Sequence, residues 1–279
     1  MISADTIRTI AANKSIHPGV IEKDYVLSKT LMSLAAIPEF RTHLVFKGGT
    51  ALKKCYYPHW RYSEDLDFTA KAALAPSQIR DMFTAAVDGV SSAFGLPMRV
   101  SEFSQYPKDV EAIVSAQMKL SYDGPLRQSS GQKNNIRVDI ALNEEIVLPT
   151  PNLNVVQEYA DDIPASLPTY ALEEVVAEKL RSILQRGKSR DYYDVWILLK
   201  EYGKDFDHQR TKDVFLKKCH SKDIPEPKVE DFFNTEQLAE AERFWERGLA
   251  HQLTVLPAFD TVLKELKSLI IAIAGETTN

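Results

Sequence analysis

The sequence predicts an α/β fold of the α+β kind, in which a small mixed β-sheet carries packed helices and a mostly helical C-terminal domain follows. The first half of the chain alternates strand and helix patterns, a proline-punctuated connector runs from Pro149 to Pro168, and the patterns from Leu172 onward are helical. A chain of 279 residues, 44% of them hydrophobic, can bury a substantial core. We therefore expect one domain over residues 1–150 and a second over residues 151–279.

The first expected elements are a helix, a short strand and a glycine turn. Apolar residues recur at helical spacing from Val20 to Ala36, and Pro38 ends that run. Leu44–Phe46 is typical of a short buried strand, and it leads into the pair Gly48-Gly49 and a helical segment that begins at Thr50. The expected order is thus strand, tight turn and helix.

A second helix and a strand meander come next. Pro76 opens a helix whose apolar members recur at intervals of three and four, and the helix stops near Gly95. Strands are then expected around residues 98–103, 112–122 and 136–142, with the polar stretch 124–134 as a hairpin loop.

The C-terminal half begins with a helix over residues 171–186, and Gly187 predicts a break before a second helix. Lys179, Arg186 and Arg190 are spaced by seven and four residues, so on a continuous helix they would share one face that could hold a triphosphate. The alternatives are a solvated helix surface and, for Arg190 with Asp194, a simple surface ion pair.

The glycine turn is the first candidate functional feature. A strand that leads through glycines into a helix N-terminus brings backbone N–H groups against an anion, and only glycine lets a phosphate approach the main chain so closely. Gly48, Gly49 and Thr50 are therefore candidates for binding a triphosphate. A plain turn is the alternative for such a pair in isolation.

Acidic residues alternate with apolar residues in two expected strands. In a strand Asp65 and Asp67 point to one face while Leu66 and Phe68 enter the core, and Asp139 is the only acid in a second apolar run. Neighbouring like charges need a cation, and Mg²⁺ is typically held by one or two carboxylates together with phosphate oxygens. The alternatives are a solvated strand edge for the pair and an ion pair with a neighbouring base for Asp139.

Ser63 and Lys119 are more ambiguous candidates. Ser63 faces the same side as Asp65 if that strand begins early, where it could contact phosphate or itself be modified as an exposed hydroxyl. A cap or turn role for Ser63 is equally compatible with its chemistry. Lys119 lies in a strand pattern, and an exposed strand lysine is the preferred interpretation.

These motifs resemble one known family, the AbiEii/AbiGii abortive-infection toxins, a branch of the DNA polymerase β-like nucleotidyltransferase superfamily. The resemblance covers about residues 20–200 in separately placed motifs whose order and spacing fit. It is carried by Glu22–Leu27, Phe46–Leu52, Arg61–Phe68, Val138–Ile140, Glu178–Arg186 and Arg190–Asp194.

The resemblance implies a polymerase β-like nucleotidyltransferase domain whose active site lies in a cleft completed by the helical domain. The implied catalytic residues are Asp65, Asp67, Asp139 and Lys179, and the three aspartates are also the implied ligands of Mg²⁺ or Mn²⁺. The candidate substrate-binding residues are Gly48, Gly49, Thr50, Lys53, Arg61, Ser63, Arg186, Arg190, Asp191 and Asp194. The sequence does not decide which of Asp191 and Asp194 enters the site.

The expected partners are a nucleoside triphosphate, an RNA acceptor and an antitoxin. The resemblance implies that the protein is the toxin of a bacterial toxin–antitoxin or phage-defence pair and suggests tRNA as the acceptor. We expect the RNA to follow a focal basic surface made of Lys53, Lys54, Arg61, Arg186 and Arg190. A net charge of −5 argues against indiscriminate coating of nucleic acid.

Composition excludes several other classes of protein. Cys55 and Cys219 lie far apart, so neither a disulfide framework nor a zinc ribbon is indicated. The apolar run Leu269–Ala274 is too short to cross a bilayer, and no secretory signal is recognisable, so we expect a cytoplasmic protein without membrane contact. The alternative functions are a small-molecule nucleotidyltransferase of the antibiotic-modifying kind, a kinase, and a nucleotide-binding module without catalytic activity.

Overall fold

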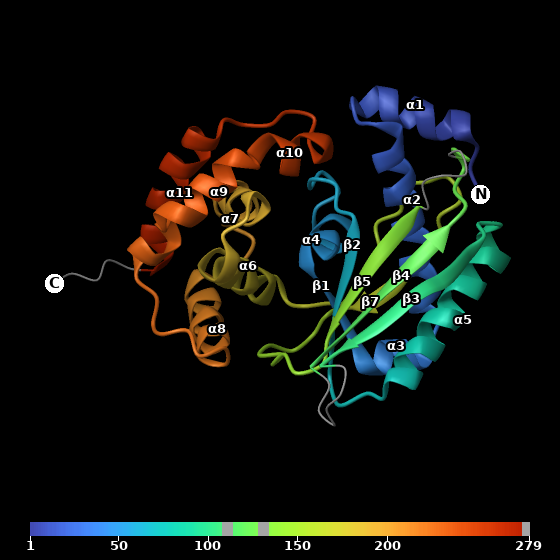
Figure 1. The fold of residues 1–279 in the computed structure, drawn as a ribbon, viewed down its shortest axis with the longest axis horizontal. Helices are drawn as coiled ribbons and strands as arrows, with labels where there is room; N and C mark the ends of the chain where they lie inside the picture. The colour runs from blue at the N-terminus through green and yellow to red at the C-terminus, as the bar shows by residue number, and fades with distance from the viewer. Residues whose placement is uncertain (108–113, 128–133, 275–279) are drawn as a thin grey trace. The chain divides into compact units, whose positions relative to one another are not determined.

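The computed structural model describes residues 1–107, 114–127 and 134–274, which form two compact units (Figure 1). Unit 1 comprises Met1–Ile146 and Thr150–Tyr170, and unit 2 comprises Val147–Pro149 and the chain from Ala171 onward. The proline-punctuated connector therefore packs mainly with unit 1. Because Val147–Pro149 belongs to unit 2, the backbone passes between the units three times.

Unit 1 is built on a five-stranded mixed sheet with the order β1-β2-β5-β4-β3. Strands β2 and β5 are parallel, and the other neighbouring pairs are antiparallel. This confirms the predicted small mixed sheet and its meander. The predicted start of the fourth strand and the middle of the hairpin loop lie outside the described residues. The strands are β1 Leu44–Lys47, β2 Asp65–Ala70, β3 Met98–Tyr106, β4 Ser115–Tyr122 and β5 Asn135–Ala141.

The helices of unit 1 pack around one apolar core, and α2 and α5 lie on the same face of the sheet (Figure 1). Both long helices were predicted; α5 ends where Gly95 adopts a φ of 62° as its C-cap. Two further helices were not predicted. Pro38 follows the end of α2 as expected, but it also starts α3, because proline suits the first turn of a helix. The helices are α1 Ala4–Lys14, α2 Pro18–Ala35, α3 Pro38–His43 and α5 Pro76–Phe94.

The predicted glycine turn joins β1 to a short helical segment. Strand β1 leads into α4 (Gly48–Ala51), which continues as the π-helical turn η1 (Leu52–Tyr56). Gly48 has a φ of 81°, in the left-handed region that favours glycine. The sharp turn therefore depends on this glycine. A small second sheet pairs β6 (Asn152–Asn154) with β7 (Ser166–Pro168).

A buried ionic network joins η1 to distant parts of unit 1. The Nζ of Lys54 lies 2.6 Å from Asp24 Oδ2 and 2.7 Å from Glu158 Oε2, and Lys53 Nζ lies 3.3 Å from Glu158 Oε1. The hydroxyl of Tyr159 donates to Asp24 Oδ2 at 2.7 Å. The prediction that Lys53 and Lys54 lie on a basic surface is therefore wrong, because partners from remote segments bury both lysines.

The regular secondary structure in the described part of unit 2 consists of helices joined by loops. The predicted break occurs at Gly187, which adopts a φ of 49° as the C-cap of α6, and α7 starts two residues later. The apolar residues Leu172, Val176, Leu180 and Ile183, which recur at helical spacing along α6, are buried. No helix among the described residues is long and apolar enough to span a membrane. The elements are α6 Leu172–Arg186, α7 Ser189–Glu201, α8 His208–His220, η2 Val229–Phe233, α9 Thr235–Arg243, α10 Trp245–Leu249, η3 Ala250–Gln252 and α11 Phe259–Ala274.

Candidate active site

The glycine turn and the carboxylate strand meet in unit 1. Strand β1 pairs with β2 so that Lys47 lies opposite Asp67, which places the start of the turn beside that carboxylate. A Cβ added at Gly48 would fall on the Oδ2 atom of Asp67. Glycine is therefore required at this position by close approach as well as by backbone conformation.

The next two residues of the turn adjoin other candidate site residues. A Cβ at Gly49 would lie 3.2 Å from Nη2 of Arg61 and 3.3 Å from Oγ of Ser63. The hydroxyl of Thr50 donates a hydrogen bond of 2.5 Å to the backbone carbonyl of Asp65. The turn thus lies beside the guanidinium of Arg61, the hydroxyls of Ser63 and Thr50, and the carboxylate strand. Its two glycines contribute no side chains.

Arg61 and Ser63 are buried beside this turn, with exposed fractions of 5% and 9%. The Nη1 of Arg61 donates to the backbone carbonyl of Tyr62 at 3.1 Å. The expectation that Arg61 belongs to an exposed basic surface is therefore wrong, and of the alternatives for Ser63 the exposed hydroxyl is not observed. Both side chains are instead held in place next to Gly49, because the segment before β2 folds back against the turn.

The three candidate metal ligands lie on the same face of two neighbouring parallel strands. Asp67 on β2 is the register partner of Asp139 on β5, and Asp65 precedes Asp67 by two residues on that face. Leu66 and Phe68 are fully buried on the opposite face, as predicted. Within the described residues, no three acidic, histidine or cysteine side chains converge closely enough to hold a metal ion alone.

Asp139 is oriented by a neighbour that sequence reasoning missed. Gln117 lies directly opposite Asp139 in the antiparallel pairing of β4 with β5, and its Nε2 donates to Asp139 Oδ1 at 2.7 Å. Burial raises the pKa of the Asp139 carboxyl above its ordinary value; Arg137 opposes this, the charge of Asp65 adds to it, and the bond from Gln117 also opposes it. Alternation along β4 could have placed Gln117 on the Asp139 face, but only the register identifies the pair.

Two other unit 1 lysines are not brought to the turn. Lys53 donates to the carbonyl of Pro58 at 3.0 Å and lies 4.5 Å from the ring centroid of Tyr62, which places it in the buried ionic network. Lys119 is exposed and forms a 2.7 Å ion pair with Glu102, which confirms its interpretation as an ordinary strand lysine.

In unit 2, Lys179 forms an ion pair with one of the two acids that the sequence left undecided. Its Nζ lies 2.7 Å from Oδ2 of Asp194, which is fully buried in α7. The lysine itself keeps 12% of its side chain exposed. Asp194 therefore fixes the position of a lysine that still reaches solvent, and the suggested pairing of Asp194 with Arg190 is not observed.

Asp191 has a different role. Its carboxylate receives two hydrogen bonds of 2.9 Å from Arg186 and one of 3.2 Å from the backbone N–H of Lys188, so it caps the first turn of α7. Because the helices break at Gly187, Lys179, Arg186 and Arg190 do not share the face of one continuous helix. The candidate residues of unit 2 thus form two local ion pairs, Lys179 with Asp194 and Arg186 with Asp191, and Arg190 belongs to neither pair.

Two solved structures share this fold. The nucleotidyltransferase toxin MenT4 from Mycobacterium tuberculosis H37Rv matches with a TM-score of 0.68 and 18% identity, over 100% of this chain and 91% of that one. JHP933 from Helicobacter pylori matches with a TM-score of 0.57 and 18% identity, over 93% of each chain. The predicted fold class is confirmed: a small mixed sheet with many helices, in a fold shared with a nucleotidyltransferase toxin.

The sequence also matches a family profile over residues 30–265, described as the nucleotidyl transferase AbiEii toxin of type IV toxin–antitoxin systems. A comparison with curated proteins finds no match. Because the profile spans most of the chain, the protein belongs to the AbiEii family of nucleotidyl transferase toxins. This confirms the resemblance stated from the motifs.

Proposed function

We propose that the protein transfers a nucleoside monophosphate from a nucleoside triphosphate to an acceptor hydroxyl, with Mg²⁺ or Mn²⁺ as the metal. One observation carries this proposal: Gly48 lies so close to Asp67 that no side chain fits between them, with Arg61 and Ser63 beside Gly49. A triphosphate at this turn would meet backbone N–H groups, a guanidinium and a carboxylate strand together.

The three aspartates of the carboxylate strands fit a metal ion whose other ligands come from the bound substrate. Asp67 and Asp139 are neighbours in register on one face, and Asp65 lies on the same face. They form no complete protein cage, but Mg²⁺ commonly uses one or two carboxylates, phosphate oxygens and water. When bound by Asp65, Asp67 and Asp139, the metal would stabilise charge on the attacking and leaving oxygens.

The other candidate residues have separate tasks in this proposal. Gly48, Gly49 and Thr50 would bind the triphosphate, and Arg61 would neutralise part of its charge. The acceptor oxygen forms a bond to the α-phosphorus, its proton passes to Asp139, and the bond from the α-phosphorus to the bridging oxygen breaks. Lys179, oriented by Asp194, would stabilise the pyrophosphate that leaves.

We further propose that the acceptor is RNA and that its 3′-terminal hydroxyl, most simply that of tRNA, is the attacking group. The family to which the chain belongs supports a toxin with a cognate antitoxin, and a cytoplasmic location would supply both triphosphate and tRNA. Of the predicted basic surface, only Arg186 and Arg190 remain at least partly exposed. The residues of the predicted basic surface that are open to RNA therefore all lie in unit 2.

The leaving group separates this proposal from its main alternative. Incubation with Mg²⁺, each nucleoside triphosphate and total tRNA should release pyrophosphate in amounts equal to the nucleotide incorporated. Release of a nucleoside diphosphate instead would identify a phosphotransferase and refute nucleotidyl transfer. Transfer to small hydroxylated compounds but not to RNA, detected by mass spectrometry, would identify a small-molecule nucleotidyltransferase.

A further inference from the structure

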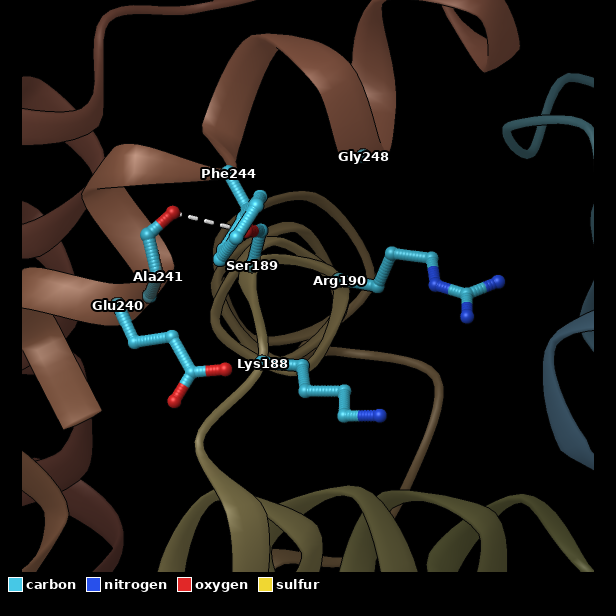
Figure 2. Close-up of a pocket in the computed structure, with 7 residues that line it drawn as sticks. All are labelled: Lys188, Ser189, Arg190, Glu240, Ala241, Phe244 and Gly248. Carbon is cyan, nitrogen blue, oxygen red and sulfur yellow. Dashed lines mark hydrogen bonds between the residues drawn. The ribbon is translucent and has the colours of Figure 1, made fainter.

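Unit 2 contains a pocket at the start of α7 (Figure 2). Its volume is about 240 Å³. Ser189 is buried and donates to the carbonyl of Ala241 at 2.8 Å, which ties α7 to α9 at the pocket. The residues that line it come from α7 and its cap, from α9 and from α10: Lys188, Ser189, Arg190, Glu240, Ala241, Phe244 and Gly248.

Two cations that line this pocket, Lys188 and Arg190, have no counter-ion among the described residues. The side chains of Lys188 and Arg190 extend in the same direction from the start of α7 (Figure 2), and neither forms a hydrogen bond or ion pair with the described part of the chain. The nearby Arg186, in contrast, is held by both oxygens of Asp191. Glu240 contributes the one negative charge of the lining, so the pocket is positive although the whole chain carries −5.

The pocket is also lined by an exposed aromatic ring, that of Phe244. Phe244 is 37% exposed, and among the described residues only Tyr106 is another exposed large aromatic side chain. The ring points toward Ser189, and the guanidinium carbon of Arg243 lies 5.3 Å from its centroid. Leaving such a ring in water forgoes the stabilisation that burial would give. Its place in a basic pocket indicates a binding role.

We propose that this pocket binds a nucleoside phosphate, which is either a free nucleotide or one nucleotide of an RNA strand. Lys188 and Arg190 contact the phosphate, the base stacks on Phe244, and the carboxylate of Glu240 accepts a hydrogen bond from a base amino group. The volume of about 240 Å³ is below the roughly 300–1,000 Å³ of pockets that enclose drug-sized ligands, so the pocket encloses part of a nucleotide and leaves the rest in solvent. This inference rests on the proposed function, which supplies both sources of the ligand.

Direct binding to the full chain, without a nucleoside triphosphate or metal, tests the pocket separately from catalysis. The probe is a fluorescein-labelled single-stranded RNA of about eight nucleotides, and unlabelled nucleoside monophosphates serve as competitors. Phe244→Leu should weaken RNA binding at least about fivefold, whereas Phe244→Tyr should bind as the parent does. Lys188→Ala should make the plot of log binding constant against log salt concentration less steep, by about 0.7, because one phosphate contact is lost. The matched control is Lys217→Ala, an exposed lysine of α8, which should change neither quantity.

Gly248 allows a test that does not remove any binding group. A Cβ at this position would lie 3.8 Å from Cβ and Oγ of Ser189, an ordinary contact distance, so alanine fits without a clash. Alanine also favours the helix, so Gly248→Ala should not lower the unfolding temperature. Gly248→Leu adds four carbon atoms at the pocket wall and should weaken binding of the probe at least about fivefold.

The results of these experiments distinguish an RNA nucleotide from a free nucleotide as the ligand. They also test the pocket separately from the proposed function. Weaker RNA binding in the Phe244→Leu and Lys188→Ala variants supports an RNA nucleotide, while loss of monophosphate binding with unchanged RNA binding supports a free nucleotide. Unchanged binding of both probes, or an equal loss with Lys217→Ala, would overturn the pocket. The Asp67→Ala protein should bind RNA normally, so binding is measured independently of catalysis, and a failure of the parent protein to transfer nucleotide would refute only the proposed function.

Discussion

Single residues around Gly48 leave no room for a side chain at this position of the turn. The carboxylate of Asp67 occupies the space that a side chain at 48 would need, and the left-handed backbone of Gly48 adds a second constraint. The sequence predicted this turn and the shared face of the aspartates, because glycine placement and period-two alternation are local signals. It could not predict that Arg61 and Ser63 fold back against Gly49, because that contact depends on the path of the intervening segment.

The first prediction concerns Asp67. Asp67→Asn should reduce nucleotide transfer about a thousandfold or more, because a lost metal contact removes several kcal/mol of transition-state stabilisation. The unfolding temperature should not fall, since the change relieves repulsion between carboxylates that share a face. Asp81→Asn, at an exposed position of α5, makes the same change in charge and should keep full activity. An Asp67→Asn enzyme with parental activity would refute the site assignment.

At the scale of elements, the basic residues of the helical unit divide into paired and unpaired groups that spacing along the sequence could not distinguish. The break at Gly187 was predictable from the glycine itself, whereas the partner of Lys179 depends on how α6 and α7 pack. The burial of Lys53 and Lys54 was missed for the same reason, because their partner Glu158 is about a hundred residues away.

The second prediction separates the charge of Lys179 from its contribution to stability. Lys179→Ala alone would remove the ammonium group that lies 2.7 Å from the buried carboxylate of Asp194, at a cost of about 3–5 kcal/mol. The double variant Lys179→Met with Asp194→Asn removes both charges and should fold, but transfer should slow at least about a hundredfold. The exposed pair in Lys200→Met with Glu265→Gln is the control, and it should retain parental kinetics. Equal losses in both double variants would argue against a placed lysine.

The third prediction concerns the ionic network that fixes η1. Although burial opposes ionisation, the charges of Lys54 and Lys53 lower the pKa of Glu158 to about 2, from an ordinary value of 4.5. Glu158 therefore contributes stability above pH 4.5 that is lost as the pH falls through about 2. Glu158→Gln should lower the free energy of unfolding by about 3 kcal/mol at pH 7, measured by urea unfolding.

The difference between the parent protein and Glu158→Gln should shrink steadily as the pH is lowered toward 2. Glu102→Gln breaks the exposed pair with Lys119 and serves as the control, with an expected change of less than about 1 kcal/mol. A difference for Glu158→Gln that stays constant across this pH range would contradict the assigned charge pairing.

At the scale of the whole molecule, the order of elements was largely readable from the sequence. The mixed sheet, the long helices and the helical C-terminal half follow from periodicity, prolines and glycines, and the motifs identified the family before the structure did. What periodicity could not supply was the packing between distant segments. The segment Thr150–Tyr170, for example, looks like a linker by composition, yet Glu158 and Tyr159 bind residues of α2 and η1.

We propose that the protein adds a nucleotide to the 3′ end of RNA through the carboxylate strands beside the glycine turn. Its most direct test is incubation with Mg²⁺, each α-labelled nucleoside triphosphate and tRNA that is either intact or periodate-oxidised at its terminal ribose. We expect label on intact tRNA only, and none with the Asp67→Asn protein. Equal label on both tRNA samples, or label on the protein itself, would contradict it.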